Sequence, residues 1–210
     1  MDNSKQDSRQ SGESLPVSET FYSLQGEGYN TGKPAFFIRL CGCNVRCSFC
    51  DSKKTWNMDS AKWLSIVELT SAVKESGAEN VVITGGEPLM HNLVPLCQSL
   101  HSTGCNLWLE TSASLPFSGE WDWVCISPKK KLPPLKENFA FADELKIVIG
   151  AAEDLDQLAN YEKAVPQHTR LYLQAEWDKR LEITPLIISY LKKHQRWRLS
   201  LQTHKWLGIE

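Results

Sequence analysis

Several features that define other protein classes are missing from this 210-residue sequence. No apolar run reaches the length of a membrane-spanning helix, and the polar N-terminal segment has no apolar core of signal-peptide length. Long lysine or arginine runs are missing as well: Lys129–Lys131 is the nearest approach, and the formal net charge is −2. We therefore expect a cytoplasmic protein that binds neither membranes nor nucleic acid.

An even, spaced set of cysteines, as in a secreted disulfide-bonded protein, is also missing. The sequence has seven cysteines, and four of them lie between positions 41 and 50. This odd and clustered pattern predicts free thiols in a reducing compartment. Residues 1–15 are mostly polar, so we expect a disordered leader followed by a single domain over residues 16–210, long enough to form its own core.

The cysteines Cys43, Cys47 and Cys50 form a motif in which three and then two residues separate them. Three thiols this close predict a shared metal centre, and in a [4Fe-4S] cluster three cysteine ligands leave one iron open for a substrate or cofactor. If residues 39–41 end a strand, Cys41 is too near Cys43 to bind the same cube, and we interpret it as a buried or spare thiol. The alternative is a zinc site made by all four cysteines.

After this motif, apolar segments of strand length alternate with helical patterns. Strands are expected at residues 20–24, 34–40, 81–83, 107–109, 123–126, 145–149, 170–173 and 197–201. Helices are expected at residues 65–76, around 93–100, at 154–164 and at 186–194, the last with Thr184 as cap and Pro185 at its first position. This alternation predicts an α/β fold, a partial and open (β/α)6-type barrel. The connection between residues 111 and 123 is short for a full helix.

Three stretches at the ends of expected strands indicate ligand binding. Residues 25–28 read Gln-Gly-Glu-Gly, a loop whose glycines allow a close approach to a polar ligand. Residues 84–88 read Thr-Gly-Gly-Glu-Pro and follow a buried strand at its carboxyl end, where such folds bind ligands. Arg39 is the single charge on an apolar strand and needs an anion, either a structural salt-bridge partner or a substrate carboxylate.

The cysteine triad, with Phe49 before its last member, and the turn at residues 84–88 resemble the two motifs of the radical S-adenosylmethionine (SAM) enzymes. Within that superfamily the chain from residue 19 onward resembles the 7-carboxy-7-deazaguanine synthase family. The similarity rests on the order and spacing of residues 24–28, 39–52, 84–88, 110–112, 127–129, 144–146 and 201–205.

This resemblance implies a radical SAM catalytic domain and a set of site residues. Cys43, Cys47 and Cys50 would bind the [4Fe-4S] cluster, with Cys41, Cys97, Cys105 and Cys125 as non-ligands. The SAM pocket would comprise Gly86, Ser112, Ser127, Pro128, Lys129 and Gln174, with a side chain at Gly86 expected to intrude on SAM and leave the cluster intact. The substrate would contact Leu24, Gln25, Gly26, Arg39, Thr84 and Glu210. Magnesium would bind Ser52, and Arg39 and Ser52 would be the catalytic pair.

The implied reaction is the ring contraction of 6-carboxy-5,6,7,8-tetrahydropterin to 7-carboxy-7-deazaguanine, with loss of ammonia, in queuosine and deazapurine biosynthesis. A radical derived from SAM would start it, and a flavodoxin-type or ferredoxin-type donor would supply the electron to a homodimeric enzyme. Two positions depart from the family pattern: Ser52 stands where threonine is expected, and Ala175 stands where proline often follows Gln174.

Two other functions are compatible with parts of the pattern. A glycyl-radical activase shares the cluster and the Gly-Gly-Glu turn but binds a protein segment, whereas Arg39 and residues 24–28 favour a small anionic substrate. A zinc-binding interaction module accounts for the cysteines and leaves the second glycine motif unexplained.

Overall fold

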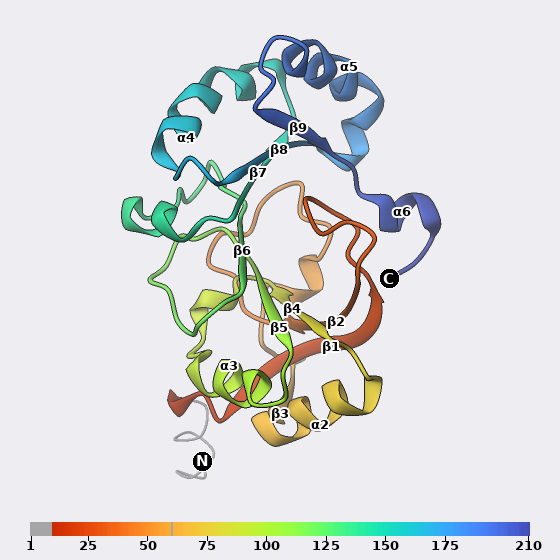
Figure 1. Cartoon of the computed structure of the whole chain (residues 1–210), viewed down its shortest axis with the longest axis vertical. Coiled ribbons are helices and arrows are strands. Elements are labelled where there is room, and N and C mark those ends of the chain that lie inside the picture. Colours follow the sequence, from red (N-terminus) through yellow and green to blue (C-terminus); the bar gives the residue numbers. More distant parts are fainter. Residues whose placement is uncertain (1–9, 60) are drawn as a thin grey trace.

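The computed structural model describes residues 10–59 and 61–210 of the chain. Within these residues, a nine-stranded sheet has the order β3-β1-β2-β4-β5-β6-β7-β8-β9. The strands are β1 Ser14–Leu24, β2 Pro34–Leu40, β3 Lys62–Ser65, β4 Asn80–Gly85, β5 Asn106–Thr111, β6 Trp123–Ile126, β7 Glu144–Ile149, β8 Arg170–Ala175 and β9 Trp197–Ser200. The sheet curves but does not close, which confirms the expected open barrel (Figure 1).

Seven of these strands, β2 and β4 to β9, run parallel, whereas β1 pairs antiparallel with both β2 and β3. The eight expected strands are all present, but β3 was not expected. Strand β1 also begins earlier than expected, at Ser14, and Leu15 is only 1% exposed. The expected boundary of the leader at residue 15 is therefore wrong, because Ser14 and Leu15 already belong to β1 and Leu15 packs in the core. Residues 1–9 of the expected leader lie outside the described part of the chain.

Four helices lie on the outer face of the curved sheet, α2 and α3 at one end and α4 and α5 at the other, whereas α6 lies beside the cavity (Figure 1). The α-helices are α2 Ile66–Ser76, α3 Val94–His101, α4 Leu158–Ala164, α5 Arg180–Leu191 and α6 Thr203–Leu207. The 3-10 helices are η1 Lys53–Thr55, η2 Pro88–Met90, η3 Lys136–Phe141, η4 Ala152–Gln157 and η5 Trp177–Lys179. No helix among the described residues has the length and apolarity needed to cross a membrane.

Local signals define helix α2 at both ends. Ser65 caps it, Glu68 completes the capping box, and Gly77 ends it at φ +67°. The expected start of α5 at Pro185 is wrong, because the helix begins at Arg180 and contains the proline. The Arg180 guanidinium packs 4.2 Å from the Trp177 ring centroid and donates to the Trp177 carbonyl oxygen, a contact that stabilises the earlier start.

Two of the six crossovers between parallel strands lack an α-helix. Residues 112–122, all of them described, are irregular, as their length indicates, and residues 127–143 contain only the 3-10 helix η3. The expected helix at 154–164 is divided between η4 and α4. In place of helices, aromatic side chains from the irregular segments cover this part of the sheet, among them Phe117 and Trp121.

Side-chain alternation along the strands separates the outer core from the inner face. On β4, Val81 and Ile83 pack with the outer helices, whereas Val82 packs with Phe37 and Trp108 on the inner face. Following this alternation toward the carboxyl ends of the strands places polar residues on the inner face, above the apolar group. These are Arg39, Thr84, Glu110, Lys146 and Gln174, and all five line a single cavity.

Candidate functional site

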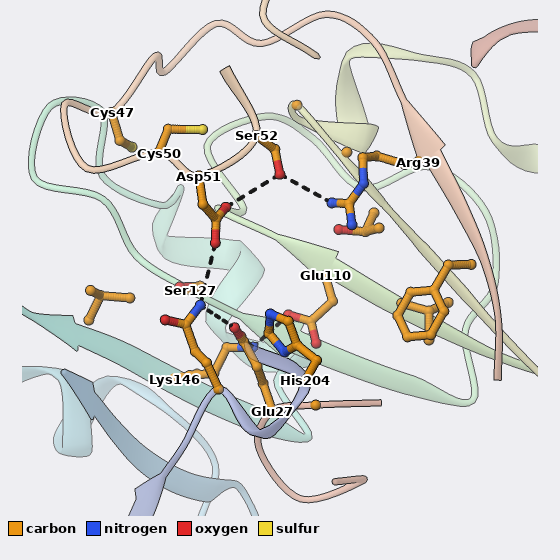
Figure 2. A pocket seen from close by; sticks show the side chains of 18 of the residues that line it. Glu27, Arg39, Cys47, Cys50, Asp51, Ser52, Glu110, Ser127, Lys146 and His204 are labelled. Carbon is orange, nitrogen blue, oxygen red and sulfur yellow. Dashed lines mark hydrogen bonds and ion pairs between the residues drawn. The ribbon is translucent and has the colours of Figure 1, made fainter. Parts of the chain in front are cut away.

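The cavity lies inside the open barrel at the carboxyl ends of the parallel strands and has a volume of about 580 Å³. Fifteen of the sixteen residues predicted for the site line it, and Pro128 does not. Figure 2 shows the cysteine loop on one side of the cavity and Glu27, Glu110 and Lys146 on the other. The two sides are built differently, one around backbone hydrogen bonds and the other around buried charges.

Backbone hydrogen bonds fix the cysteine loop. The Gly42 amide donates to the Thr55 carbonyl oxygen at 2.7 Å, and the Cys43 amide donates to the Trp56 carbonyl oxygen at 3.2 Å. Arg46 adopts a left-handed φ of 53°, which brings its amide to 3.5 Å from the Cys43 Sγ. This turn presents the three thiols toward the cavity.

The three thiols differ from the other four in exposure. Cys43, Cys47 and Cys50 are half-buried and line the cavity, whereas Cys41, Cys97, Cys105 and Cys125 are buried, and all seven are free. In the described chain, no three His, Cys, Asp or Glu side chains converge as ligands of one metal ion. The three thiols that line the cavity are soft ligands of the type that iron–sulfur clusters use, and three of them leave one iron of a [4Fe-4S] cluster open, so the donor set fits such a cluster.

The Gly-Gly turn at the end of β4 packs directly against the cysteine loop. A Cβ at Gly86 would clash with the Gly42 carbonyl oxygen and approach the Cys43 Cβ. The Gly86 amide donates to the Leu40 carbonyl oxygen at 3.0 Å. A side chain at Gly86 therefore meets the cysteine loop first, so the reason for expecting an intact cluster does not hold, while its effect on SAM binding stays a prediction.

The carboxylate of Glu87, in the same turn, is 1% exposed and accepts four hydrogen bonds. Its donors are the Leu89 amide, the Thr111 hydroxyl, and the Ser112 amide and hydroxyl, at 2.5 to 3.1 Å. Glu87 therefore joins the β4 turn to the end of β5. The Ser112 hydroxyl, predicted to face SAM, is held by this carboxylate.

The opposite side of the cavity, which we call the floor, consists of Gln25, Glu27, Glu110 and Lys146. The Lys146 Nζ lies 2.7 Å from Glu27 and 3.0 Å from Glu110, and its side chain is only 4% exposed. Gln25 Nε2 donates to the other Glu110 oxygen at 3.2 Å. The floor thus offers carboxylate oxygens held in place by one buried cation.

The ionisation of the floor follows from this arrangement. Burial would raise the pKa of Glu27, but the charge and hydrogen bond of Lys146 outweigh burial and lower that pKa to about 2. Burial likewise disfavours the charged Lys146, yet the carboxylates of Glu110 and Glu27 raise its pKa well above the usual value. At neutral pH both groups are charged.

Glu144 begins strand β7, two positions before Lys146, and its pKa is shifted in the opposite direction to that of Glu27. It is 2% exposed, and burial raises its pKa to about 7, with Glu110 adding repulsion. Its Oε2 accepts the Tyr29 amide at 3.0 Å, while its Oε1 has no hydrogen-bond partner. A Cβ at Gly28 would clash with this carboxyl group, just as a Cβ at Gly26 would clash with the His204 ring. The glycines of the 25–28 loop therefore approach the chain's own polar groups.

Arg39 lies beside Ser52, which follows the cysteine loop (Figure 2). Its Nε donates to Glu19 at 2.7 Å, and its Nη1 lies 3.4 Å from the Ser52 hydroxyl, which in turn contacts Asp51 at 3.3 Å (Figure 2). Burial opposes ionisation of Glu19, but hydrogen bonds from Lys54 and Arg39 keep its pKa below the usual value. Arg39 thus has a structural partner and lines the cavity as well.

The C-terminal segment closes the side of the cavity. Lys205 contacts Asp51 at 2.8 Å, and Gln202 Nε2 donates to Glu27 at 2.9 Å. Burial lowers the pKa of His204, so its ring is neutral at pH 7. The Glu210 carbonyl oxygen accepts the Ser23 hydroxyl at 2.7 Å, which places the predicted substrate contact at the cavity edge.

The remaining predicted SAM-pocket residues lie at the carboxyl ends of β6 and β8, the two strands that flank β7. Lys129 Nζ donates to the Ser127 carbonyl oxygen at 2.9 Å and to its hydroxyl at 2.5 Å, and burial lowers the pKa of Lys129. Gln174 is 4% exposed, and its Oε1 accepts the Ser200 hydroxyl at 2.7 Å.

The sequence predicted no specific contact for Glu110, Lys146 or His204, and for Glu27 it indicated only a polar ligand near the 25–28 loop. A usable signal was present for Lys146, which is the single charge in the expected strand at residues 145–149, as Arg39 is in the strand at 34–40. Glu110 directly follows the expected strand at 107–109, and His204 lies in the short helix α6, whose position beside the 25–28 loop depends on the tertiary structure.

Comparisons with known proteins agree with this geometry. Residues 37–169 match the family described as the radical SAM superfamily. A 7-carboxy-7-deazaguanine synthase from Synechocystis sp. is 45% identical over 196 residues, covering 93% of this chain and 94% of the relative. One from Flavobacterium psychrophilum is 43% identical over 201 residues, covering 94% of each.

The solved structures include a similar fold. The crystal structure of QueE from Escherichia coli superposes with a TM-score of 0.82 at 32% identity, covering 96% of this chain and 98% of that chain. Two motifs, an open barrel and near-full-length similarity therefore agree. The chain belongs to the 7-carboxy-7-deazaguanine synthase family of the radical SAM superfamily.

Proposed function

We propose that this protein converts 6-carboxy-5,6,7,8-tetrahydropterin to 7-carboxy-7-deazaguanine with release of ammonia, a carbon–nitrogen lyase reaction of queuosine and deazapurine biosynthesis. The observation that carries the proposal is the single cavity that joins the cysteine loop to a floor of fixed polar groups. A small molecule with both ring N–H donors and a carboxylate matches this lining.

As a radical SAM enzyme of this family, the protein uses a [4Fe-4S] cluster and SAM, acts on a small molecule and requires a reductant. When bound, these cofactors supply the electron and the hydrogen-abstracting radical that start the reaction. Cys43, Cys47 and Cys50 are the proposed cluster ligands. Gly86, Ser112, Ser127, Lys129 and Gln174 are the proposed lining of the SAM half of the cavity.

The protein's own contribution is to orient the pterin and exclude water. Glu27 and Glu110 are fixed by Lys146, so their remaining lone pairs are acceptors for ring N–H groups without reorganisation. Leu24, Gln25, Gly26, Thr84 and Glu210 complete the proposed substrate lining. A pterin ring offers adjacent N–H donors along one edge, which matches a row of fixed carboxylate oxygens.

Arg39 is the proposed partner of the substrate carboxylate. Its Nε is occupied by Glu19, and its Nη1 is directed toward Ser52 at the cavity wall. Truncating one partner of a buried charge pair costs about 2 to 5 kcal/mol. Arg39→Ala should therefore lower kcat/KM by this amount, and Arg39→Lys should restore it only in part, because an ammonium cannot form the two-pronged contact.

A matched variant separates the two roles of Arg39. Glu19→Gln removes the structural ion pair and leaves the guanidinium in place. If Arg39 serves only as the partner of Glu19, then Glu19→Gln and Arg39→Ala will change kcat/KM equally. A much larger loss in Arg39→Ala supports the substrate contact.

Magnesium is the proposed third cofactor, bound through the Ser52 hydroxyl. The neighbouring Asp51 carboxylate, 3.3 Å from that hydroxyl, supplies negative charge, and magnesium usually keeps several waters beside one or two protein oxygens. Measuring turnover against magnesium concentration tests this site. Activity that is unchanged by exhaustive chelation would exclude it.

The electron donor is proposed to be a flavodoxin-type or ferredoxin-type protein that approaches the exposed side of the cysteine loop, where Arg46 and Lys53 are exposed. The enzyme is proposed to act as a homodimer in the cytoplasm. Large apolar side chains on its C-terminal elements, Leu181 at 80%, Trp206 at 61% and Leu207 at 64% exposure, support self-association. Sedimentation at several concentrations tests the dimer, and fractionation tests the location.

The decisive experiment is anaerobic turnover of the carboxy-tetrahydropterin with SAM, magnesium and a reductant, with the product identified by mass spectrometry. Formation of 7-carboxy-7-deazaguanine and one ammonia per product is expected, together with its loss when SAM is omitted. Cys47→Ala is the matched control, because it removes one proposed cluster ligand from the exposed loop. A reconstituted enzyme with a complete cluster and bound SAM that leaves the pterin unchanged would contradict the proposal.

A further inference from the structure

Ser200, on the last strand of the sheet, connects two parts of the cavity that are far apart in sequence. Its hydroxyl donates to Gln174 Oε1 at 2.7 Å and accepts the Gly28 amide at 3.0 Å. Gln174 belongs to the proposed SAM half, whereas Gly28 ends the 25–28 loop of the proposed substrate half. A single buried hydroxyl, on a residue 3% exposed, therefore contacts both a residue of the SAM half and the end of the loop that supplies the substrate half.

The direction of these hydrogen bonds is fixed by the chemistry of the groups. A backbone amide only donates, so the Ser200 oxygen must accept from Gly28, and its one proton is free for Gln174. The Ser200 hydroxyl donates this proton to the amide oxygen of Gln174, so the two N–H donors of that amide remain available for other partners. Because Gln174 lines the cavity, it presents donors to a bound ligand. Ser200 thereby orients Gln174. Position 175 is alanine, so no proline fixes the backbone directly after Gln174.

The 25–28 loop and Tyr29 make other hydrogen bonds, but these do not involve Gln174. Thr203 Oγ1 donates to the Gly26 carbonyl oxygen at 3.0 Å, and the Tyr29 amide donates to Glu144 at 3.0 Å. These contacts hold the loop to α6 and to the base of β7. Ser200 and Gln174 also face each other across adjacent strands β8 and β9, so their positions are tied to the rigid sheet.

We infer that Ser200 is a positioning residue that couples the two halves of the cavity, so that SAM bound against Gln174 and pterin bound against the 25–28 loop strengthen each other's binding. The physical reason is that ordering Gln174 also orders Gly28 through the shared hydroxyl, and the second ligand then meets a loop that is already fixed. Coupling of this kind is reciprocal and is typically about 5-fold to 150-fold in affinity. The inference rests on the proposed function for the identity of the two ligands.

The first test measures the SAM dissociation constant of the cluster-loaded enzyme by anaerobic calorimetry, without reductant, with and without saturating 6-carboxy-5,6,7,8-tetrahydropterin. The wild type should bind SAM at least about 5-fold more tightly with the pterin present. The ratio of the SAM dissociation constants without and with pterin is the measure of coupling. In Ser200→Ala this ratio should fall to within about 2-fold of unity, and Gln174→Met should do the same. The double variant should add nothing, because both changes break one link.

Thr203→Val is the matched control, because it removes a hydroxyl that holds the same loop without contacting Gln174. It should keep the wild-type ratio even if pterin binding weakens. A Ser200→Ala enzyme with the wild-type ratio would overturn the inference, and so would equal loss of the ratio in Thr203→Val.

A second readout needs SAM alone and is independent of the substrate. Addition of SAM should slow hydrogen exchange of the Gly28 amide in the wild type and in Thr203→Val, but not in Ser200→Ala. If the wild type shows this slowing but does not bind the pterin, the proposed substrate is wrong and the link stands. If the wild type binds both ligands but the pterin does not change the SAM dissociation constant and SAM does not slow exchange of the Gly28 amide, the link is wrong and the proposed function stands.

Discussion

The cysteine loop and the cavity floor lie on opposite sides of one cavity and are held by different forces. The loop is fixed by backbone hydrogen bonds and by glycines in direct backbone contact, as at Gly42 and Gly86. The floor is fixed by buried charges, with Lys146 between Glu27 and Glu110. We therefore expect the loop to be sensitive to added volume and the floor to be sensitive to changes of charge and pH.

The largest effect is expected from adding one methyl group to the loop's packing surface. In Gly86→Ala the new Cβ meets the Gly42 carbonyl oxygen, and backbone must move, so Cys43 is displaced and iron content should fall below about half of the wild-type value. Iron and sulfide analysis after reconstitution measures this. SAM binding should be lost together with the cluster.

Gly77→Ala is the control for the same chemical change. Nothing lies within 4 Å of a Cβ at Gly77, but its φ of +67° makes alanine strained by about 1 to 2 kcal/mol. This variant should be less stable and keep its cluster. Full cluster content in Gly86→Ala would show that the loop is not held by close packing.

Removing the central cation should have the next largest effect. Lys146→Met leaves the buried Glu27 and Glu110 without their shared cation and with only amide donors, which costs about 3 to 5 kcal/mol of unfolding free energy. Lys54→Met is the control, because Lys54 is exposed and Glu19 keeps Arg39 as a partner, so the cost should stay below about 1 kcal/mol. Urea unfolding at pH 7 compares them, and equal costs would contradict the charge-based account of the floor.

The floor region should also show two opposite pH dependences. Glu144 has a folded-state pKa of about 7, raised from 4.5, so its contribution to stability is fully present below pH 4.5 and is lost as the pH rises to 7. Glu27 has a folded-state pKa of about 2, so its contribution is present above pH 4.5 and is lost as the pH falls toward 2.

Glu144→Gln isolates the first of these effects. The variant has no carboxyl to ionise, so the unfolding free energy of the wild type relative to the variant should fall by about 1 to 3 kcal/mol between pH 5 and pH 8. Using the difference cancels the titration of His204, which both proteins share. A difference that stays constant over this range would show that Glu144 is ionised in the folded protein at pH 5.

The smallest effect is expected at the boundary between the two sides. Ser52→Thr should lower the magnesium concentration for half-maximal turnover by a few-fold, less than about 1 kcal/mol, because the added methyl restricts the hydroxyl rotamers. Ser48→Thr, an exposed change in the same loop, should have no effect. An identical magnesium response in all three proteins would argue against a ligand at position 52.

The predictable part of the fold followed from local signals. The limits of β2 and β6 and both ends of α2 were expected from apolar runs, a capping box and a terminal glycine. The start of α5 was not, because a tertiary contact between Arg180 and Trp177 outweighs the preference of Pro185 for a first turn. Strand β3 was missed because its four residues are stabilised by pairing with β1, a partner far away in sequence.

The sequence by itself determined the cysteine triad, the Gly-Gly turn and the alternation of strands and helices, because each depends on covalent spacing or local conformational preference. Only the tertiary structure decided which charges meet beneath the cavity and that Gly86 packs on the cysteine loop. It also decided that one serine reaches both Gln174 and the 25–28 loop. These contacts join residues separated by between 26 and 175 positions, and no local pattern specifies which of many compatible partners will be brought within hydrogen-bonding distance.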